Sequence, residues 1–219
     1  MRAAPDDLGH RTAANRRAVA DLVATLDEDQ LRGPSLCAGW TCRDVVGHLL
    51  VCIEMSVPRF LLEVARDRGR ADAASDRLAR ARAARPVGEL VEVLRRRSGD
   101  AVSQPGVGPH GPFADSCIHL RDIAVPLGLA ATPPVADWTV VLAFLVTPRA
   151  RAAGFLPRGR LDGLRLEADD TGWSAGDGAL VSGSSEALAL VVSGRPAGLD
   201  GVTGPGAALL RDRVTPGNG

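Results

Sequence analysis

The fold is decided by the stretch TCRDVVGHLL, residues 41–50. Thr41 followed three residues later by Asp44 has the pattern of a capping box, in which each side chain bonds the other residue's backbone N–H at the start of a helix. An apolar stretch from Val45 to about residue 65 follows, and it predicts a helix that begins here. Pro58 lacks the N–H of an internal helical hydrogen bond, so it should kink this helix or split it in two.

A second informative stretch is DSCIHLRDIAVPLG at residues 115–128, which predicts a helix from about 113 to 127 that ends at Gly128. Asp115 and His119 are four residues apart, which places both side chains on one face with Cβ atoms about 6 Å apart. His48 lies among Val and Leu side chains on the first helix and needs a polar partner there. If the two helices are antiparallel neighbours, the three residues supply two nitrogens and a carboxylate, a set that suits zinc and leaves a fourth position open.

The same three residues also fit a structure without metal, as a solvated Asp115, a hydrogen-bonded core histidine and a histidine at a helix end. Cys52 follows His48 by four residues, and Cys117 lies beside the predicted pair on the second helix. Each of these cysteines is either a further thiolate ligand or a small buried hydrophobic residue. Spacing alone does not choose between these alternatives.

Other polar residues near the two helices have less specific patterns. Asp122 comes three residues after His119, so it either orients that imidazole or pairs with an arginine such as Arg43. His110 falls in a Gly/Pro-rich stretch, where a solvated loop histidine is expected. Trp40 is expected to be a packing anchor at the start of the first helix.

The rest of the chain divides into a helical part and a part with short strands. Further helices are expected at residues 8–26, 87–102, 138–153 and 185–192, and strands at 161–167, 172–175 and 179–182. The polar segment 66–85 indicates a long surface connection with some helix, and residues 104–112 indicate a loop. The predicted fold class is α+β, with an up-down four-helix bundle over residues 1–156 and a small α/β domain over 157–219, separated near Pro157.

Composition limits the kind of partner. The 219 residues carry 26 basic and 26 acidic side chains, and the basic ones are all Arg, which indicates a GC-rich and hence actinobacterial coding background. Zero net charge and the lack of a basic surface interleaved with aromatic residues argue against nucleic-acid binding. No run reaches the ~20 apolar residues of a membrane span, and no secretory leader is recognisable. We therefore expect a cytoplasmic protein with reduced cysteines and no membrane or nucleic-acid partner.

Two blocks of the sequence resemble the mycothiol-dependent maleylpyruvate isomerase family, which belongs to the wider DinB-like group of metal-binding four-helix bundles. The first is PSLCAGWTCRDVVGHL at residues 34–49, and the second is the stretch 115–128. The C-terminal part, with LDGLRLEADDTGW at 161–173 and GRP at 194–196, is similar to the small α/β domain of that family. The resemblance spans nearly the whole chain and implies a DinB-like bundle followed by such a domain.

The resemblance implies that His48, Asp115 and His119 are the metal ligands, the same residues that the helical spacing selects. The family pattern has Glu where this chain has Asp115, which is shorter by one methylene and leaves metal affinity or identity open. It also implies mycothiol, a low-molecular-weight thiol, as cosubstrate for a small electrophilic substrate. Arg195 would be a catalytic residue that holds a carboxylate of substrate or thiol, although an arginine there also complements a helix C-terminus without any ligand.

The implied activity is metal-assisted thiol chemistry, either isomerisation of maleylpyruvate to fumarylpyruvate or S-transfer to an electrophile. Two further functions stay open. One is that of a non-catalytic metal-binding or regulatory bundle, which a metal saturated by the three ligands and a cysteine would favour. The other is that of a divergent member of the family recruited to a specialised biosynthetic reaction.

Overall fold

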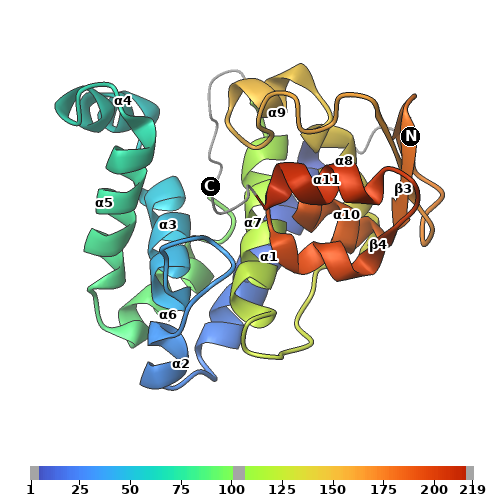
Figure 1. Ribbon diagram of the computed structural model, residues 1–219. Helices are drawn as coiled ribbons and strands as arrows, with labels where there is room; N and C mark the ends of the chain where they lie inside the picture. Colours follow the sequence, from blue (N-terminus) through green and yellow to red (C-terminus); the bar gives the residue numbers. More distant parts are fainter. Residues whose placement is uncertain (1–4, 101–106, 216–219) are drawn as a thin grey trace. The chain divides into compact units, whose positions relative to one another are not determined.

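The computed structural model describes residues 5–100 and 107–215, which form two compact units, Met1–Thr132 and Pro133–Gly219 (Figure 1). The first unit is built of helices and the second carries a four-stranded sheet, so the predicted fold class is confirmed. The predicted boundary near Pro157 differs from this division, because helix α8 (Val135–Leu145) packs against helix α10 (Ser185–Val192) of the second unit. Within the described residues, no helix combines the length and apolarity that a membrane span requires.

The first unit packs its helices in pairs around an aliphatic core. Its described elements are α1 (Pro5–Val23), α2 (Glu28–Arg32), α3 (Cys42–Glu54), α4 (Val57–Arg66), α5 (Ala71–Ala83), α6 (Val87–Arg96) and α7 (His110–Ala124). Helix α1 packs against α6 and α7, and α3 packs against α5, α6 and α7 (Figure 1). The buried side chains between them include Val23, Leu49, Leu90, Leu94 and Ile123, each of which contributes about 1.5–3 kcal/mol when fully buried.

Helix α3 begins as the capping box predicts. Thr41 Oγ1 accepts a hydrogen bond from the Asp44 N–H at 3.1 Å, and Asp44 Oδ2 accepts one from the Thr41 N–H at 3.0 Å. The helix ends at Glu54 and the chain resumes as α4, so the predicted interruption is confirmed. Pro58 lies in the first turn of α4, where the helix start leaves N–H groups unpaired in any case.

Helix α5 corrects the expectation that residues 66–85 form a surface connection, because it packs along α3 as a full member of the unit (Figure 1). Its buried side consists mostly of small residues, Ala74, Leu78, Ala79 and Ala83, which hide the apolar period. Gly47 of α3 permits the close approach, since a Cβ there would overlap the carbonyl oxygen of Ala79. Helices α3 and α5 therefore pack closely because the residues between them are small, and not because large apolar side chains fill the interface.

The described part of the second unit, residues 133–215, combines a small sheet with four α-helices and one 3₁₀ helix. Its elements are α8, α9 (Pro148–Ala152), β1 (Leu164–Ala168), β2 (Ser174–Gly176), β3 (Ala179–Gly183), α10, the 3₁₀ helix η1 (Pro196–Gly201), β4 (Val202–Thr203) and α11 (Ala207–Val214). The strand order is β2-β1-β3-β4, with β1 parallel to β3 and both outer pairs antiparallel. Leu164 and Leu166 of β1 are buried and Arg165 between them is exposed, the alternation of a half-buried strand. The predicted helix 138–153 is divided into α8 and α9, and α10 has its predicted bounds.

Candidate metal centre

Helix α3 presents His48 and Cys52 on one face, because residues four apart on a helix are neighbours. The His48 Nδ1 atom lies 3.4 Å from Ser75 Oγ of α5. The imidazole centroid lies 5.3 Å from the Trp40 ring, whose indole N–H donates to Asp76 Oδ1 of α5 at 2.8 Å. These contacts fix the ring, so that the second ring nitrogen, Nε2, faces α7.

Helix α7 contributes Asp115, His119 and Asp122. It begins at His110, so the predicted loop 104–112 ends at residue 109, and residues 104–106 of that prediction lie outside the described part. His119 Nδ1 lies 2.8 Å from Asp122 Oδ2, and the Asp122 side chain is fully buried. Asp122 therefore lies where a residue that orients the imidazole must lie, while Arg43, its alternative partner, pairs with Glu28 at 3.1 Å.

Asp115 is the point on which both histidines converge. Its Oδ2 atom lies 3.3 Å from His48 Nε2, and its Oδ1 atom lies 3.2 Å from His119 Nε2. The centroids of the two imidazoles are 4.9 Å apart. Cys52 Sγ joins the group at 3.6 Å from Asp115 Oδ2 and 3.7 Å from His48 Nε2. The structure thus brings together the three residues selected by spacing and adds a thiol.

The contacts of the two rings with Asp115 require either a proton on each Nε2 atom or a bound cation between the rings and the carboxylate. A carboxylate only accepts hydrogen bonds, and a neutral imidazole with its proton on Nδ1 would direct a lone pair at it. The Nδ1 atoms of His48 and His119 each have a partner of their own, Ser75 and Asp122 respectively. Without a cation, His119 must be positively charged, since both of its ring nitrogens face carboxylates, whereas His48 can be neutral because the Ser75 hydroxyl can donate to its Nδ1.

The pKa values of the three groups are shifted in the directions that favour charged histidines beside a charged Asp115. Burial lowers the pKa of His48, but the negative charges of Cys52 and Asp115 outweigh it and raise that pKa to about 10. Burial also opposes the charge on His119, whose pKa is nevertheless raised well above its ordinary value by Asp115. The pKa of Asp115 is lowered well below its ordinary value, because the charges of His119 and His48 outweigh its burial.

The donor types fit a divalent cation. Imidazole nitrogen, carboxylate oxygen and thiolate sulfur are the ligands that zinc takes in proteins. Among the described residues, His48, Cys52 and Asp115 offer ligand atoms that all lie within 4.8 Å of one another. With His119 beside the second oxygen of Asp115, these residues could hold one metal ion.

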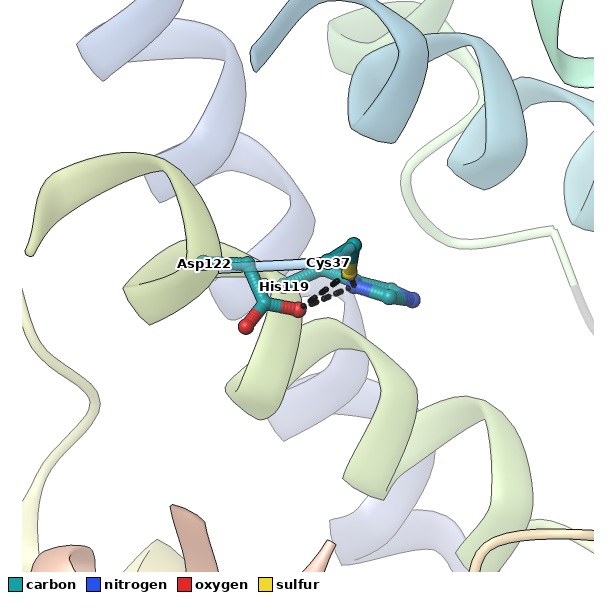
Figure 2. A group of neighbouring side chains, drawn as sticks. All are labelled: Cys37, His119 and Asp122. Carbon is teal, nitrogen blue, oxygen red and sulfur yellow. Dashed lines mark hydrogen bonds and ion pairs between the residues drawn. The ribbon is translucent and has the colours of Figure 1, made fainter. Parts of the chain in front are cut away.

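A second group of donors within 4.8 Å of one another consists of Cys37, His119 and Asp122 (Figure 2). The Cys37 thiol donates to Asp122 Oδ2 at 3.1 Å, and its sulfur lies 3.9 Å from His119 Nδ1. Figure 2 shows Cys37 and Asp122 at the same end of the imidazole, with the opposite end of the ring pointing away from both. This second group therefore holds Nδ1 and leaves Nε2 directed at Asp115.

Sequence reasoning missed two of these neighbours, Cys37 and Ser75. Cys37 lies in the loop before α3, and no helical spacing relates it to α7. Ser75 lies in α5, whose packing against α3 the sequence pattern conceals.

Arg16 of α1 is a third missed residue, with only 3% of its surface exposed. Its guanidinium donates to the carbonyl oxygens of Ser98 and Asp100, both at 2.9 Å. Burial lowers its pKa, while the charges of Cys52 and Asp115 act in the opposite direction, which places Arg16 within electrostatic reach of the centre. Helix α1 carries other arginines, Arg11 and Arg17, so no signal in the sequence marks Arg16 as the buried one.

Two other candidates of the first unit, Cys117 and His110, lie outside the centre. Cys117 is fully buried and accepts a hydrogen bond from Asn15 at 3.2 Å, as expected for a small buried residue. His110 is exposed at the first position of α7. Arg195 lies in the second unit, where it donates to the Ser193 carbonyl at 2.7 Å, and its catalytic role stays a prediction.

Comparisons with known proteins bear on the family and on the fold. Residues 12–109 match the family described as the mycothiol maleylpyruvate isomerase N-terminal domain, a segment that includes His48 and ends before Asp115. The fold is similar to the crystal structure of a mycothiol-dependent maleylpyruvate isomerase, with TM-score 0.52 and 19% identity over 94% of each chain. A mutant form of such an isomerase gives TM-score 0.49 and 16% identity over 94% of each chain. No curated protein matches the sequence. The predicted resemblance to the mycothiol-dependent maleylpyruvate isomerase family is thus confirmed as a match of residues 12–109 to the model of its N-terminal domain, and the structural similarity extends over nearly the whole fold.

Proposed function

We propose that this protein is a metal-dependent enzyme that uses a low-molecular-weight thiol, mycothiol, to act on a small electrophilic substrate. The observation that carries the proposal is the convergence of His48 Nε2 and His119 Nε2 on the two oxygens of Asp115, at 3.3 and 3.2 Å. The family match over residues 12–109 supports the same class of enzyme. In this proposal His48, Asp115 and His119 hold a divalent metal, and the donor types favour zinc.

The protein's own residues prepare the centre. Asp122 and Ser75 hold the Nδ1 atoms of His119 and His48, which keeps both Nε2 atoms available as ligands. When bound, the metal supplies positive charge that lowers the pKa of a coordinated thiol, so that thiolate is present at neutral pH. Asp115, shorter than the glutamate of the family pattern, reaches both histidines within the folded unit.

For a substrate of the maleylpyruvate type, the thiolate adds to the activated carbon–carbon double bond and forms a C–S bond. The electron pair of the double bond moves into the neighbouring carbonyl group. Rotation about the resulting single bond and return of the electron pair expel the thiolate and leave the trans double bond, so the thiol is regenerated. An S-transferase would use the same thiolate, with the C–S bond retained in the product.

Arg195 is proposed to bind a carboxylate of the substrate or of the thiol through its two parallel N–H donors. An Arg195→Lys variant keeps the charge but loses this paired geometry. We expect it to raise KM more than it lowers kcat, and an Arg195→Ala variant to show a larger rise. Unchanged kinetics in both variants would remove Arg195 from the catalytic site.

A thiol-dependence assay tests the proposal. Turnover of maleylpyruvate and of a generic electrophile is measured with the zinc-loaded protein, with and without mycothiol, beside a His48→Gln variant. We expect thiol-dependent turnover of at least one substrate in the wild type and its loss in the variant. Thiol-independent or absent turnover of both substrates would contradict the proposal.

The position of Cys52 supports a second candidate, a non-catalytic metal-binding bundle, since its sulfur lies within 3.7 Å of two proposed ligand atoms and could help to saturate the metal. Stoichiometric zinc without any thiol-dependent turnover would favour this candidate. For either function we propose a cytoplasmic location, where the reducing thiol pool keeps the cysteines reduced.

A further inference from the structure

We propose that the sulfur of Cys52 is itself a ligand of the metal, beside His48 and Asp115; this inference rests on the metal site of the proposed function. Cys52 and His48 come from the same face of α3, and Asp115 comes from α7, so two helices supply the donors. The Cys52 side chain is only partly buried, unlike Cys42 and Cys117, which are fully enclosed in the core. Cys52 is thus less enclosed than the two core cysteines, as Cys37 is too.

The distances between the three donor atoms support Cys52 as a ligand. Zinc bonds of about 2.3 Å to sulfur and about 2.0–2.2 Å to nitrogen or oxygen place tetrahedral ligands about 3.4 Å apart for N and O, and about 3.6 Å apart when one is sulfur. The observed separations are 3.3 Å from His48 Nε2 to Asp115 Oδ2, 3.7 Å from Cys52 Sγ to His48 Nε2, and 3.6 Å from Cys52 Sγ to Asp115 Oδ2. All three separations match the edges of a tetrahedron around one ion.

The group of Cys37, His119 and Asp122 provides an internal contrast. Its N to O separation is 2.8 Å and its S to O separation is 3.1 Å, both well below tetrahedral edges, whereas its S to N separation is 3.9 Å. A separation of 2.8 Å is the length of a charge-assisted hydrogen bond. The same three residue types are thus joined by short hydrogen bonds in the group around Asp122, and are spaced like the ligands of one ion in the group around Asp115.

A thiolate ligand has chemical consequences for the site. Sulfur favours zinc or cobalt over magnesium or manganese, which prefer oxygen ligands. Together with His119, the site then has four protein donors, and an incoming thiol requires a fifth position, an expansion that catalytic zinc sites allow. The His48 and Asp115 side chains are 19% and 16% exposed and that of His119 only 7%, so solvent reaches the site on the side of the first two.

Cobalt substitution tests the role of Cys52 without relying on activity. The demetallated full-length protein is titrated with Co²⁺, and the near-ultraviolet sulfur-to-cobalt charge-transfer band is recorded for wild type, Cys52→Ser and the matched control Cys37→Ser. We expect the band in wild type and Cys37→Ser and its loss in Cys52→Ser. Cobalt affinity in Cys52→Ser should fall at least about tenfold, the loss that even outer partners of metal ligands cause.

The outcomes separate this inference from the proposed function. Cobalt bound by wild type without the sulfur band, or with a band unchanged in Cys52→Ser, would overturn the role of Cys52 and leave the metal site intact. Wild-type protein that binds no cobalt would overturn the metal site itself. If Cys52→Ser does not fold, alkylation of wild type provides the test: zinc should slow the reaction of Cys52 with iodoacetamide more than that of Cys37, and equal slowing would contradict the proposal.

Discussion

Two groups of donors share the centre of the first unit, and they differ in distance rather than in residue type. His48, Cys52 and Asp115 stand 3.3–3.7 Å apart, whereas Asp122 lies 2.8 Å from His119 and 3.1 Å from Cys37. The longer distances match the edges of a tetrahedron of ligands around one ion, and the shorter ones have the length of charge-assisted hydrogen bonds. His, Cys and Asp therefore do not define a metal site by composition; the separation of their ligand atoms does.

The two groups meet at His119, which belongs to the second through Nδ1 and faces Asp115 of the first through Nε2. A buried carboxylate that accepts from Nδ1–H fixes the tautomer and the orientation of a ligating histidine. In the proposed metal centre, the hydrogen-bonded group would thus be the outer support of the ligand group, and variants in each should have effects of different size.

The largest effect is expected from His48→Gln, which removes a proposed ligand from the first group. Metal analysis of the purified variant should find the stoichiometric zinc of wild type lost. His10→Gln, on the exposed face of α1, is the matched control and should retain zinc. Equal and negligible metal in the wild type and both variants would show that the first group is not a metal site.

Asp122→Asn should have the next largest effect, because it removes the charge that supports His119 while keeping the side-chain shape. We expect zinc affinity to fall by about 10–100-fold with the site still able to fill at saturating metal. Competition with a chelating dye measures this change. Asp21→Asn, at an exposed ion pair with Arg95, is the control, and an equal loss in both variants would deny Asp122 a specific role.

Gly47→Ala tests whether the close packing of α3 against α5 positions the His48 side chain of the first group. The added Cβ would overlap the Ala79 carbonyl, so the free energy of unfolding should fall by about 1–3 kcal/mol. Zinc affinity should fall as well, since Ser75 of α5 contacts His48. Chemical denaturation measures the first effect, with Gly88→Ala as control because an added Cβ there meets nothing within 4 Å. Equal stability of the two variants would contradict the close packing of α3 and α5.

The smallest effect is expected from Cys37→Ser, which keeps a hydrogen-bond donor to Asp122. Zinc affinity should stay within a factor of about three, since one neutral hydrogen bond is exchanged for another. The same chelator competition measures it. If this variant loses its bound zinc, the metal site would be the second group, Cys37, His119 and Asp122, and not the first.

Local signals predicted much of this arrangement. The Thr41–Asp44 capping box located the start of α3, and the spacing of four placed Asp115 and His119 on one face of α7. The helical bundle and the convergence of His48 on that pair followed from these signals together with the family resemblance. Each of the local signals depends on interactions within a few residues of the chain, which a single sequence displays.

The parts that were not predicted depend on contacts between distant segments. The buried side of α5 is built largely of alanine, so its packing against Gly47 leaves no apolar period to detect. Cys37 meets Asp122 only because the loop before α3 folds over α7, and no sequence spacing records that contact. The assignment of α8 to the second unit likewise depends on packing against α10, far along the chain.

The most direct test of metal-dependent thiol chemistry is the binding of mycothiol to the zinc-loaded and the demetallated protein, measured by isothermal titration calorimetry. If the thiol binds at the metal held by His48, Asp115 and His119, the loaded protein should bind it and the demetallated protein should not, and by linkage mycothiol should tighten zinc binding equally. Equal mycothiol affinity in the two forms would contradict the mechanism.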